Sequence, residues 1–409
     1  MAKIDDSVKK KVPELRFPGF TDDWEERKLG EFSDVRDGTH ASPKYVSQGH
    51  PMVTSKNLTH SGLDMTDVSF LTDEDFNEIN KRSKVSIGDI LFGMIGTIGN
   101  PVIVDRDDFA IKNVALIKEK TSNPITNKWL LPYLKSPSFN RFIQKENAGG
   151  TQKFIALGLI RDMKLRVPEF DEQQKIGSFF KQLDNTITLH QRKLDLLKEQ
   201  KKGYLQKMFP KNGAKVPELR FAGFADDWEE RKLSSIAERV TRKNKNNEST
   251  LPLTISAQDG LVDQNDYFNK QVASRDVTGY FLVKNGEFAY NKSYSNGYPW
   301  GAIKRLDKYE MGVLSTLYIV FKPTAINSQF LVSYYETTRW YREVSKNAAE
   351  GARNHGLLNI SPNDFFNTLL TIPKSAEEQQ QIGSFFKQLD DTIALHQRKL
   401  DLLKEQKKG

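Results

Sequence analysis

Two glycine-containing loops carry the side chains best suited to contacting another molecule. The first runs Ala-Gly-Gly-Thr-Gln-Lys over 148–153, and the second runs Ala-Glu-Gly-Ala-Arg-Asn-His over 349–355. Arginine pairs with guanine, asparagine and glutamine pair with adenine, and lysine binds phosphate. A solvated turn has the same composition, so the loops predict either a reader of nucleic-acid bases or an ordinary surface turn. The candidate contacts, including two from the polar segment 291–297, are Thr151, Gln152, Lys153, Asn291, Lys292, Arg353 and Asn354.

The motifs of autonomous catalysis are missing from the sequence. No glycine precedes a lysine, so a phosphate-binding Gly-x-x-x-x-Gly-Lys-Ser/Thr loop is excluded. No Pro-Pro pair occurs, so the Asn-Pro-Pro-Phe type of adenine methyltransferase motif is absent. The zinc-binding motif His-Glu-x-x-His is absent as well. The six histidines have no metal or triad spacing. Asp195, Glu199 and Lys201 superficially resemble a nuclease cluster, but they recur 206 residues later and are interpreted as surface charge. We therefore predict no catalytic residue and no metal site.

The chain repeats itself once. Residues 12–29 return as 216–233 with 16 of 18 positions identical, and residues 173–203 return as 379–409 with 28 of 31 identical. The intervening stretches are similar in length but almost unrelated in sequence. This order predicts two half-molecules related by a pseudo-twofold, with matched frames and different inserts. Two similar modules that recognise different things fit the pattern best.

The second repeated segment predicts a long helix in each copy. Its apolar residues recur at alternating spacings of four and three, which is the heptad pattern of a coiled coil. The two helices can pair with each other, antiparallel under the pseudo-twofold; two amphipathic helices packed on their own domains are the alternative. A helix of this length spans about 47 Å, against about 34–36 Å for one DNA turn, so the pair would hold two heads about one turn apart. The predicted seam is Ile176, Phe180, Leu183, Ile187, Leu194, Leu197, Ile382, Phe386, Leu389, Ile393, Leu400 and Leu403, with His190 and His396 as neutral seam residues.

The first repeated segment contains Trp24 and Trp228 and shows no helical stripe. Its Pro, Gly and aromatic residues predict a clasp that packs on the helix ends, with the two tryptophans in the core. Docking of a partner on the two tryptophans is the alternative role.

The inserts predict mixed α/β structure. Apolar strands with glycine turns are expected in Ser83–Asp105 and Phe281–Pro323. Helices are expected at 127–146 and 328–346, followed by the polar loops and by short strands at Lys164–Val167 and Thr368–Ile372. The predicted fold class is therefore α/β, mixed α+β, with two globular domains and two long antiparallel helices.

Composition limits the class of protein. The 409 residues, 37% apolar and 11% aromatic, suffice for two or three domains with their own cores. A formal charge of +8 favours a polyanionic partner, though weakly. The absence of cysteine excludes disulfides and thiolate chemistry and fits a reducing cytosol. Neither a signal peptide nor a membrane span of about 18 apolar residues is found, so we predict a soluble cytoplasmic chain.

On these residues the sequence resembles the specificity subunits of type I restriction-modification enzymes. The resemblance rests on the repeated VPELRF-x-GF-x-DDWEERKL, on GDILFGMIGTIGN, and on the repeated EQQ-x-IGSFFKQLD and HQRKLDLLKEQKKG segments, which span the whole chain. It implies two target recognition domains, each reading half of a split, asymmetric DNA sequence. The implied segments are an N-terminal frame at 1–29, recognition domain 1 at 30–172, a central helix at 173–211, a repeated frame at 212–233, recognition domain 2 at 234–378 and a C-terminal helix at 379–409.

The resemblance also implies partners. The chain would be non-catalytic, bind double-stranded DNA, and dock two modification subunits on its helices and tryptophan clasps; these would recruit restriction subunits. S-adenosylmethionine, ATP and Mg would then be bound by the partner subunits and no cofactor by this chain.

Three alternatives stay open. A self-sufficient methyltransferase or nuclease requires a cofactor loop or acidic cluster that the sequence lacks. A stand-alone, single-chain bipartite DNA-binding protein predicts a helix-turn-helix reader, whereas these inserts are strand-rich. A protein scaffold without a DNA role is mildly disfavoured by the basic charge. One departure from symmetry is that the first helix continues past Gly203 as Tyr-Leu-Gln-Lys-Met-Phe, and the repeat predicts the same continuation after Gly409.

Overall fold

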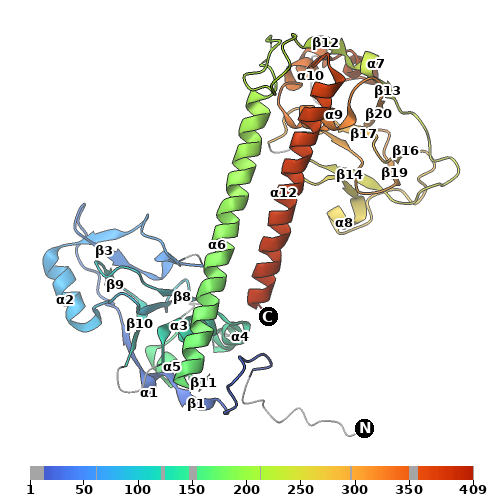
Figure 1. Cartoon of the computed structure of the whole chain (residues 1–409). Coiled ribbons are helices and arrows are strands. Elements are labelled where there is room, and N and C mark those ends of the chain that lie inside the picture. The colour runs from blue at the N-terminus through green and yellow to red at the C-terminus, as the bar shows by residue number, and fades with distance from the viewer. Residues whose placement is uncertain are drawn as a thin grey trace, which may run out of the picture. The chain divides into compact units, whose positions relative to one another are not determined.

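The chain divides into two compact units. A computed structural model describes residues 13–60, 62–120, 125–146, 154–211, 213–294, 297–349 and 358–408. Unit 1 comprises Met1–His190 with Leu400–Gly409, and unit 2 comprises Gln191–Lys399. Helices α6 (Phe170–Lys207) and α12 (Ala376–Lys408) therefore each contribute to both units (Figure 1). None of the helices in the described ranges has an apolar stretch long enough to cross a bilayer.

Unit 1 is built on an antiparallel four-stranded sheet in the order β2-β10-β7-β8. Successive side chains of a strand point to opposite faces, so Phe92 and Ile117 join one apolar cluster while Leu91 and Leu116 join another. The sheet is therefore buried on both sides. Its strands are β2 (Ser33–Asp37), β7 (Ile90–Gly93), β8 (Gly99–Ile103) and β10 (Val114–Glu119).

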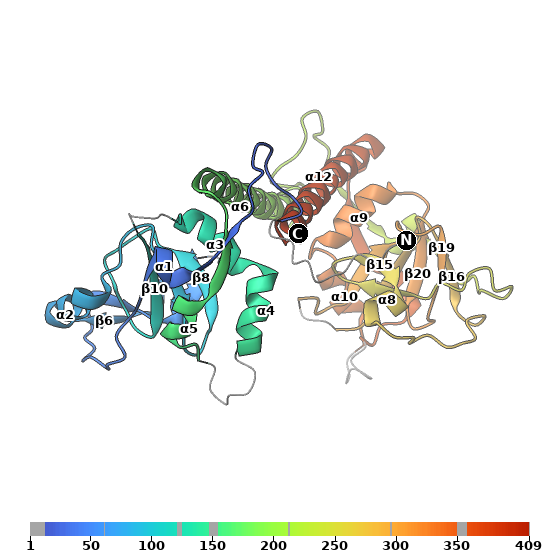
Figure 2. The same ribbon diagram turned by 90° about the horizontal axis from the view of Figure 1, so that it is seen from below.

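Helices cover one face of this sheet, a second sheet, β6-β3-β9, covers the other, and α2 packs on that second sheet (Figures 1 and 2). The covering helices are α3 (Asn127–Lys135), α4 (Pro137–Glu146) and α5 (Leu157–Asp162). The remaining elements are β1 (Glu25–Lys28), α1 (Leu29–Phe32), β3 (His50–Val53), η1 (Ser55–Asn57), β4 (Leu58–Thr59), β5 (Gly62–Leu63), β6 (Ser69–Leu71), α2 (Asp73–Ser83), β9 (Ala110–Ile111) and β11 (Lys164–Val167).

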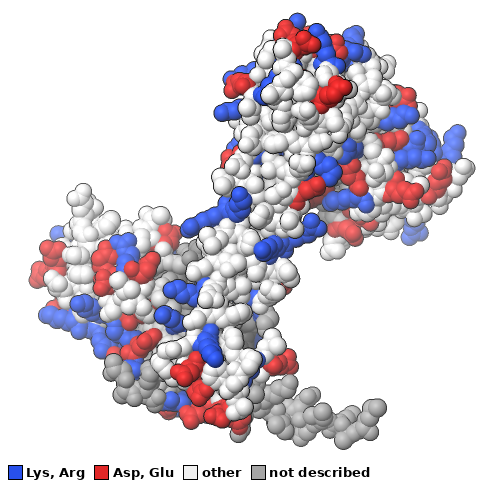
Figure 3. Space-filling model, viewed as in Figure 1, with Lys and Arg blue, Asp and Glu red and all other residues white. Residues whose placement is uncertain are grey.

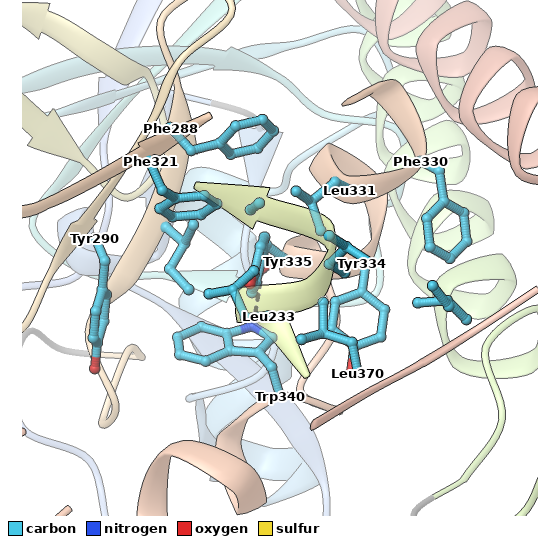
Figure 4. Close-up of a cluster of buried hydrophobic side chains, with 14 of the residues drawn as sticks. Leu233, Phe288, Tyr290, Phe321, Phe330, Leu331, Tyr334, Tyr335, Trp340 and Leu370 are labelled. Atoms are coloured by element: carbon cyan, nitrogen blue, oxygen red, sulfur yellow. Dashed lines mark hydrogen bonds between the residues drawn. The ribbon is translucent and has the colours of Figure 1, made fainter. Parts of the chain in front are cut away.

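Unit 2 repeats this plan with the sheet β13-β20-β17-β18. Phe288, Tyr290 and Phe321 project from one face into a cluster with Tyr335 and Trp340, whose indole N–H donates to the Tyr335 carbonyl at 3.1 Å (Figure 4). The elements are β12 (Glu229–Lys232), α7 (Leu233–Ile236), β13 (Ala237–Arg239), β14 (Leu253–Ser256), β15 (Gly260–Asp263), α8 (Gln264–Phe268), β16 (Phe281–Lys284), β17 (Phe288–Asn291), β18 (Ala302–Arg305), β19 (Met311–Leu314), β20 (Ile319–Pro323), α9 (Ser328–Glu336), α10 (Tyr341–Asn347), α11 (Pro362–Phe366) and β21 (Leu369–Ile372).

Two predicted helices are each divided into two in the structure. The segment predicted at 127–146 breaks at Ser136, which is extended with ψ 151° because Pro137 disfavours the helical conformation of the residue before it. The segment predicted at 328–346 breaks between α9 and α10. The helical pattern predicted for each segment is therefore present, as two shorter helices instead of one. The short strands expected before each long helix are present as β11 and β21.

The two long helices pair antiparallel within unit 2. The Tyr204 ring packs edge-on against Phe385 at 5.1 Å, and Lys201, one turn earlier in α6, pairs with Asp390, further along α12, at 2.5 Å. Unit 1 contains the repeat-equivalent ion pair, Lys407 with Asp184. All apolar residues predicted for the seam are buried or half-buried.

A buried glutamate fastens the start of each long helix to the repeated N-terminal segment. In unit 1, Arg16 donates to both carboxylate oxygens of Glu172 at 2.7 and 2.8 Å, and the Trp24 indole donates at 3.1 Å. In unit 2, Arg220 and Trp228 hold Glu378 in the same way, at 2.7, 2.8 and 3.2 Å. The two glutamates are 0% and 1% exposed. The expected packing of the tryptophan segments on the helix ends is therefore seen in both copies.

The next residues tie each helix to its insert. Gln173 accepts from the Thr126 amide at 3.0 Å, and Gln379 accepts from the Asn327 amide at 2.9 Å; these amides lie at the N-termini of α3 and α9. A Cβ added at Gly383 would lie 2.7 Å from the Phe330 nitrogen, so glycine permits α12 to touch α9. Frame, insert and helix thus meet at one place in each unit.

We predict that Arg220→Ala lowers the free energy of unfolding by about 3–5 kcal/mol, because it leaves the buried Glu378 carboxylate without its cation. Arg231→Ala is the matched control: it removes an exposed pair with Glu229 and should cost about 1 kcal/mol or less. Denaturant unfolding monitored by circular dichroism measures both. Equal losses for the two variants would contradict the anchoring role of Glu378.

Candidate nucleic-acid interface

The two polar loops start and end at matching places in the two units. The predicted contacts Thr151, Gln152, Lys153, Arg353 and Asn354 lie outside the described residues. Their flanks are described. The Ile155 amide donates to the Met94 carbonyl at 2.9 Å, just after β7, and the Leu358 amide donates to the Lys292 carbonyl at 3.0 Å, just after β17. Each loop therefore rejoins its unit beside the turn that follows an equivalent central strand.

Asn291, at the end of β17, lines a polar pocket of about 380 Å³. Its side-chain oxygen accepts from the Ser293 amide at 3.0 Å. The turn that follows Asn291 returns to it at Gly301, which has a φ of +82°. A Cβ at Gly301 would lie 2.1 Å from the Asn291 carbonyl oxygen, so only glycine permits this close approach. The other polar residues of the pocket offer hydroxyl, amide and carboxylate groups: Ser256, Gln258, Asp259, Tyr267, Ser293 and Tyr298.

Lys292 is half-buried beside the second loop. Its ammonium group donates to the Ile360 carbonyl at 3.4 Å, and burial lowers the pKa of the lysine. The structure therefore brings Lys292 next to the end of the loop that contains Arg353 and Asn354. The Lys292 ammonium group points towards Ile360, which follows shortly after the end of that loop.

A basic cleft of about 1100 Å³ adjoins the Asn291 pocket in unit 2, and the two share Ala257, Gln258, Tyr298 and Ala302. Its walls carry seven basic and two acidic side chains, an excess that favours a polyanion. Tyr298, Trp340 and Tyr341 add aromatic surface. The basic residues are Lys198, Lys201, Lys202, Lys207, Lys211, Lys304 and Arg339.

Elsewhere the charges are mixed. On the face shown in Figure 3, Lys and Arg are interspersed with Asp and Glu in each unit, so no single-signed patch marks a DNA surface there. Two residues of the basic run at 242–245 have structural contacts: Arg242 binds both carboxylate oxygens of Glu287 at 2.8 Å, and the Lys243 ammonium lies 4.2 Å from the Phe281 ring centre. Within the described ranges, no group of three or more His, Asp or Glu residues is placed to hold a metal ion.

Two lysines of the cleft have opposite electrostatic environments. Burial alone would lower the pKa of Lys201, but Glu336 and Asp390, at 2.7 and 2.5 Å, outweigh it and raise the pKa. For Lys304, burial dominates and lowers the pKa. Lys201 is thus held in ion pairs with Glu336 and Asp390. An anion that enters the cleft would stabilise the charged form of Lys304.

The candidate docking tryptophans, Trp24 and Trp228, are the residues that donate to the buried Glu172 and Glu378. Trp228 is fully buried and Trp24 half-buried, so a partner docked on the unit 2 clasp would contact the residues around Trp228 rather than its ring.

Sequence reasoning missed Gln258, Tyr298 and Lys304. Lys304 pairs with Ala289 across the β17-β18 ladder, and Gln258 comes from the turn between β14 and β15. Their proximity arises from sheet pairing rather than from any local pattern. The only local signal is the turn sequence Gln-Asp-Gly at 258–260.

Comparisons with known proteins agree with this architecture. The family model "Type I restriction modification DNA specificity domain" matches residues 21–199 and 225–405, so the chain belongs to this family. The putative type I restriction enzyme MjaX specificity subunit of Methanocaldococcus jannaschii is 26% identical over 199 residues, and the match spans only about half of that relative, 46% of each chain. The MjaVIII specificity subunit of the same organism is 22% identical and aligns over 98% of this chain and 93% of its own.

A solved structure shows the same fold. The S subunit of a type I restriction-modification system from M. genitalium superposes with a TM-score of 0.58 at 15% identity, covering 97% of this chain and 96% of that chain. The predicted family and the mixed α/β fold class with an internal repeat are thus confirmed.

We predict that Lys198→Gln combined with Lys202→Gln weakens duplex DNA binding, because two phosphate partners are lost from the cleft wall. The slope of log affinity against log salt should fall by about 1.8, since each neutralised phosphate contributes about 0.9. The control, Lys387→Gln with Lys399→Gln, changes two lysines of α12 in the same unit that do not line the cleft. Fluorescence anisotropy across a salt series measures both; an unchanged slope in the first variant would remove the cleft from the interface.

Proposed function

We propose that the chain is the DNA sequence-recognition subunit of a type I restriction-modification complex. The observation that carries this proposal is that the two specificity-domain matches fall one in each half of the repeat, where the same frame surrounds unrelated inserts. Each recognition domain reads one half of a bipartite, asymmetric target. The long helices set the distance between the half-sites.

The subunit itself is non-catalytic in this proposal and works in the cytoplasm. It binds double-stranded DNA and two modification subunits, which methylate adenine with S-adenosylmethionine. Restriction subunits join through the same complex and use ATP and Mg. This division of labour is supported by the absence from the sequence of the cofactor-binding loops named above.

Exposed leucines on the long helices support docking of the modification subunits there. Leu189 and Leu196 on α6 are 64% and 52% exposed, and their repeat equivalents on α12, Leu395 and Leu402, are 60% and 59% exposed. The leucines of each pair are seven residues apart, so each pair lies on one helix face. Repeated apolar positions outside the seam are suited to two copies of one partner.

We expect that changing Leu189, Leu196, Leu395 and Leu402 to glutamate abolishes co-purification with the modification subunit, because each change places a charge in an apolar contact. Duplex DNA binding by the free chain should stay unchanged. The control changes the exposed Phe268 and Leu317 of unit 2, which lie outside the helices. If the glutamate variant still binds two modification subunits, the docking surface lies elsewhere.

The proposed function predicts a split methylation motif. Co-expression with the modification subunit in a methylation-free host should place N6-methyladenine in two fixed half-sites separated by a constant gap. Replacing residues 30–172 with the insert of another family member should change one half-site and preserve the other, because each insert reads separately. Long-read sequencing of the host DNA measures both motifs. A change in both half-sites would contradict modular reading, and a complex that forms without methylating would contradict the recognition role.

A further inference from the structure

Lys304 is a half-buried cation in the edge strand β18 of the unit 2 sheet. Its ammonium group forms neither a hydrogen bond nor an ion pair with any described residue, and burial lowers its pKa. Glu336 and Asp390 attract it electrostatically, but their carboxylates are already paired with Lys201. An anion supplied from outside the chain would therefore stabilise the charged form of Lys304.

The equivalent position in unit 1 is apolar. There Leu91 pairs with Val102 at the place in the sheet where Ala289 pairs with Lys304 in unit 2. Val102 is 4% exposed and belongs to the same apolar cluster as Leu91. The sheet is therefore compatible with an apolar side chain at this position. The lysine is a feature of the second insert that the fold does not require.

The Asn291 pocket offers hydrogen-bonding groups that are not used within the described part of the chain. The Asn291 side-chain oxygen is occupied by the Ser293 amide, so its NH2 group remains to donate. The Gln258 amide and the Tyr298 hydroxyl also line the pocket, and neither has a hydrogen-bond partner among the described residues. The pocket is therefore suited to a polar ligand with several donors and acceptors.

The pocket and the basic cleft meet beside Lys304. Ala302 lines both of them, and Lys304 lines the cleft. The two residues are two positions apart in β18, so their side chains point to the same face of the sheet, about 7 Å apart along the strand. A ligand held in the pocket can therefore extend a charged group past Ala302 to the Lys304 ammonium.

This combination of groups matches a nucleotide. Amide side chains pair with base edges, tyrosine rings stack on bases, and lysine binds phosphate. Gln258 and Asn291 supply the amides, and Tyr267 and Tyr298 supply the rings. The pocket volume of about 380 Å³ lies within the usual range of small-molecule sites. A base stacked in a duplex presents only its edge, so a base that enters such a pocket lies outside the stack.

We propose that the Asn291 pocket and the adjoining part of the basic cleft form a binding site for one nucleotide that is not stacked in a duplex. The base lies in the pocket and contacts the amides of Gln258 and Asn291, and the phosphate contacts Lys304. A free nucleoside monophosphate and an unpaired nucleotide of a DNA strand share this chemistry. Adenine is the base that a glutamine or asparagine amide matches with two hydrogen bonds.

Calorimetric titration of the full chain with AMP and with adenosine measures the two parts of the site separately. AMP should bind about tenfold more tightly than adenosine, because its phosphate adds a charge-assisted contact. Lys304→Gln should weaken AMP binding by about tenfold and leave adenosine binding unchanged, which also shows that the variant is folded. Gln258→Ala should weaken both ligands by the same factor. The control, Lys308→Gln, changes an exposed lysine just after β18 and should bind AMP as the unchanged chain does.

A duplex with one extrahelical adenosine distinguishes the two sources of the nucleotide. If the site takes an unpaired nucleotide of a strand, this duplex should bind more tightly than the fully paired duplex in fluorescence anisotropy. Lys304→Gln should then remove the difference. If AMP binds and the two duplexes have equal affinity, the ligand is the free nucleotide. AMP binding is measured on the chain alone, so it does not depend on recognition of paired DNA.

Three results would overturn the proposal. The first is that AMP does not bind at millimolar concentration and the two duplexes bind equally. The second is equal affinity for AMP and adenosine, which would mean that no phosphate contacts Lys304. The third is equal loss of AMP binding in Lys304→Gln and Lys308→Gln, which would show a general charge effect. A failure of the recognition function would appear instead as a missing methylation motif, with AMP binding retained.

Discussion

The structure depends on a buried carboxylate at the start of each long helix, Glu172 in α6 and Glu378 in α12. A buried charge is tolerable only when it is paired and its oxygens are satisfied. Both partners, an arginine and a tryptophan, come from the repeated segment about 150 residues earlier in the chain. The buried carboxylate at the helix start is therefore satisfied only when this segment packs against it. This requirement accounts for the arginine, tryptophan and glutamate that recur in both halves although the sequence between the repeated segments differs.

The inserts vary without losing the sheet that carries them. Orders β2-β10-β7-β8 and β13-β20-β17-β18 are the same, and in both units one face of the sheet packs on the helices next to the long helix. The opposite face differs: β3 and β9 cover it in unit 1, and the two-stranded sheets β14-β15 and β16-β19 cover it in unit 2. The difference between the two inserts is thus concentrated on the sheet face opposite the helices that pack next to the long helix. The polar loops also rejoin their units after equivalent strands, so new side chains can be presented without rebuilding the frame.

Periodic features could be predicted from the sequence, and features made by long-range pairing could not. The heptad seam, the short strands β11 and β21 and the tryptophan clasps follow from spacing and from the repeat. The breaks between α3 and α4 and between α9 and α10 were missed, although Pro137 was a usable signal for the first. In the site, Asn291 and Lys292 lie beside the predicted loop. Gln258, Tyr298 and Lys304 reach the same surface through strands and turns far apart in sequence, and no local pattern marks them.

The inserts also influence the helices that they accompany. At the same position of the repeat, the second insert supplies Glu336 and the first supplies Lys135. Glu336 attracts Lys201 of α6, whereas Lys135 repels Lys407 of α12. Both contacts are half-buried, so they are screened less than surface pairs. The choice of insert therefore changes how firmly a helix end is held as well as which side chains the polar loop carries. An exchange of inserts transfers both properties together, because the polar loop and the residue that faces the helix belong to one segment.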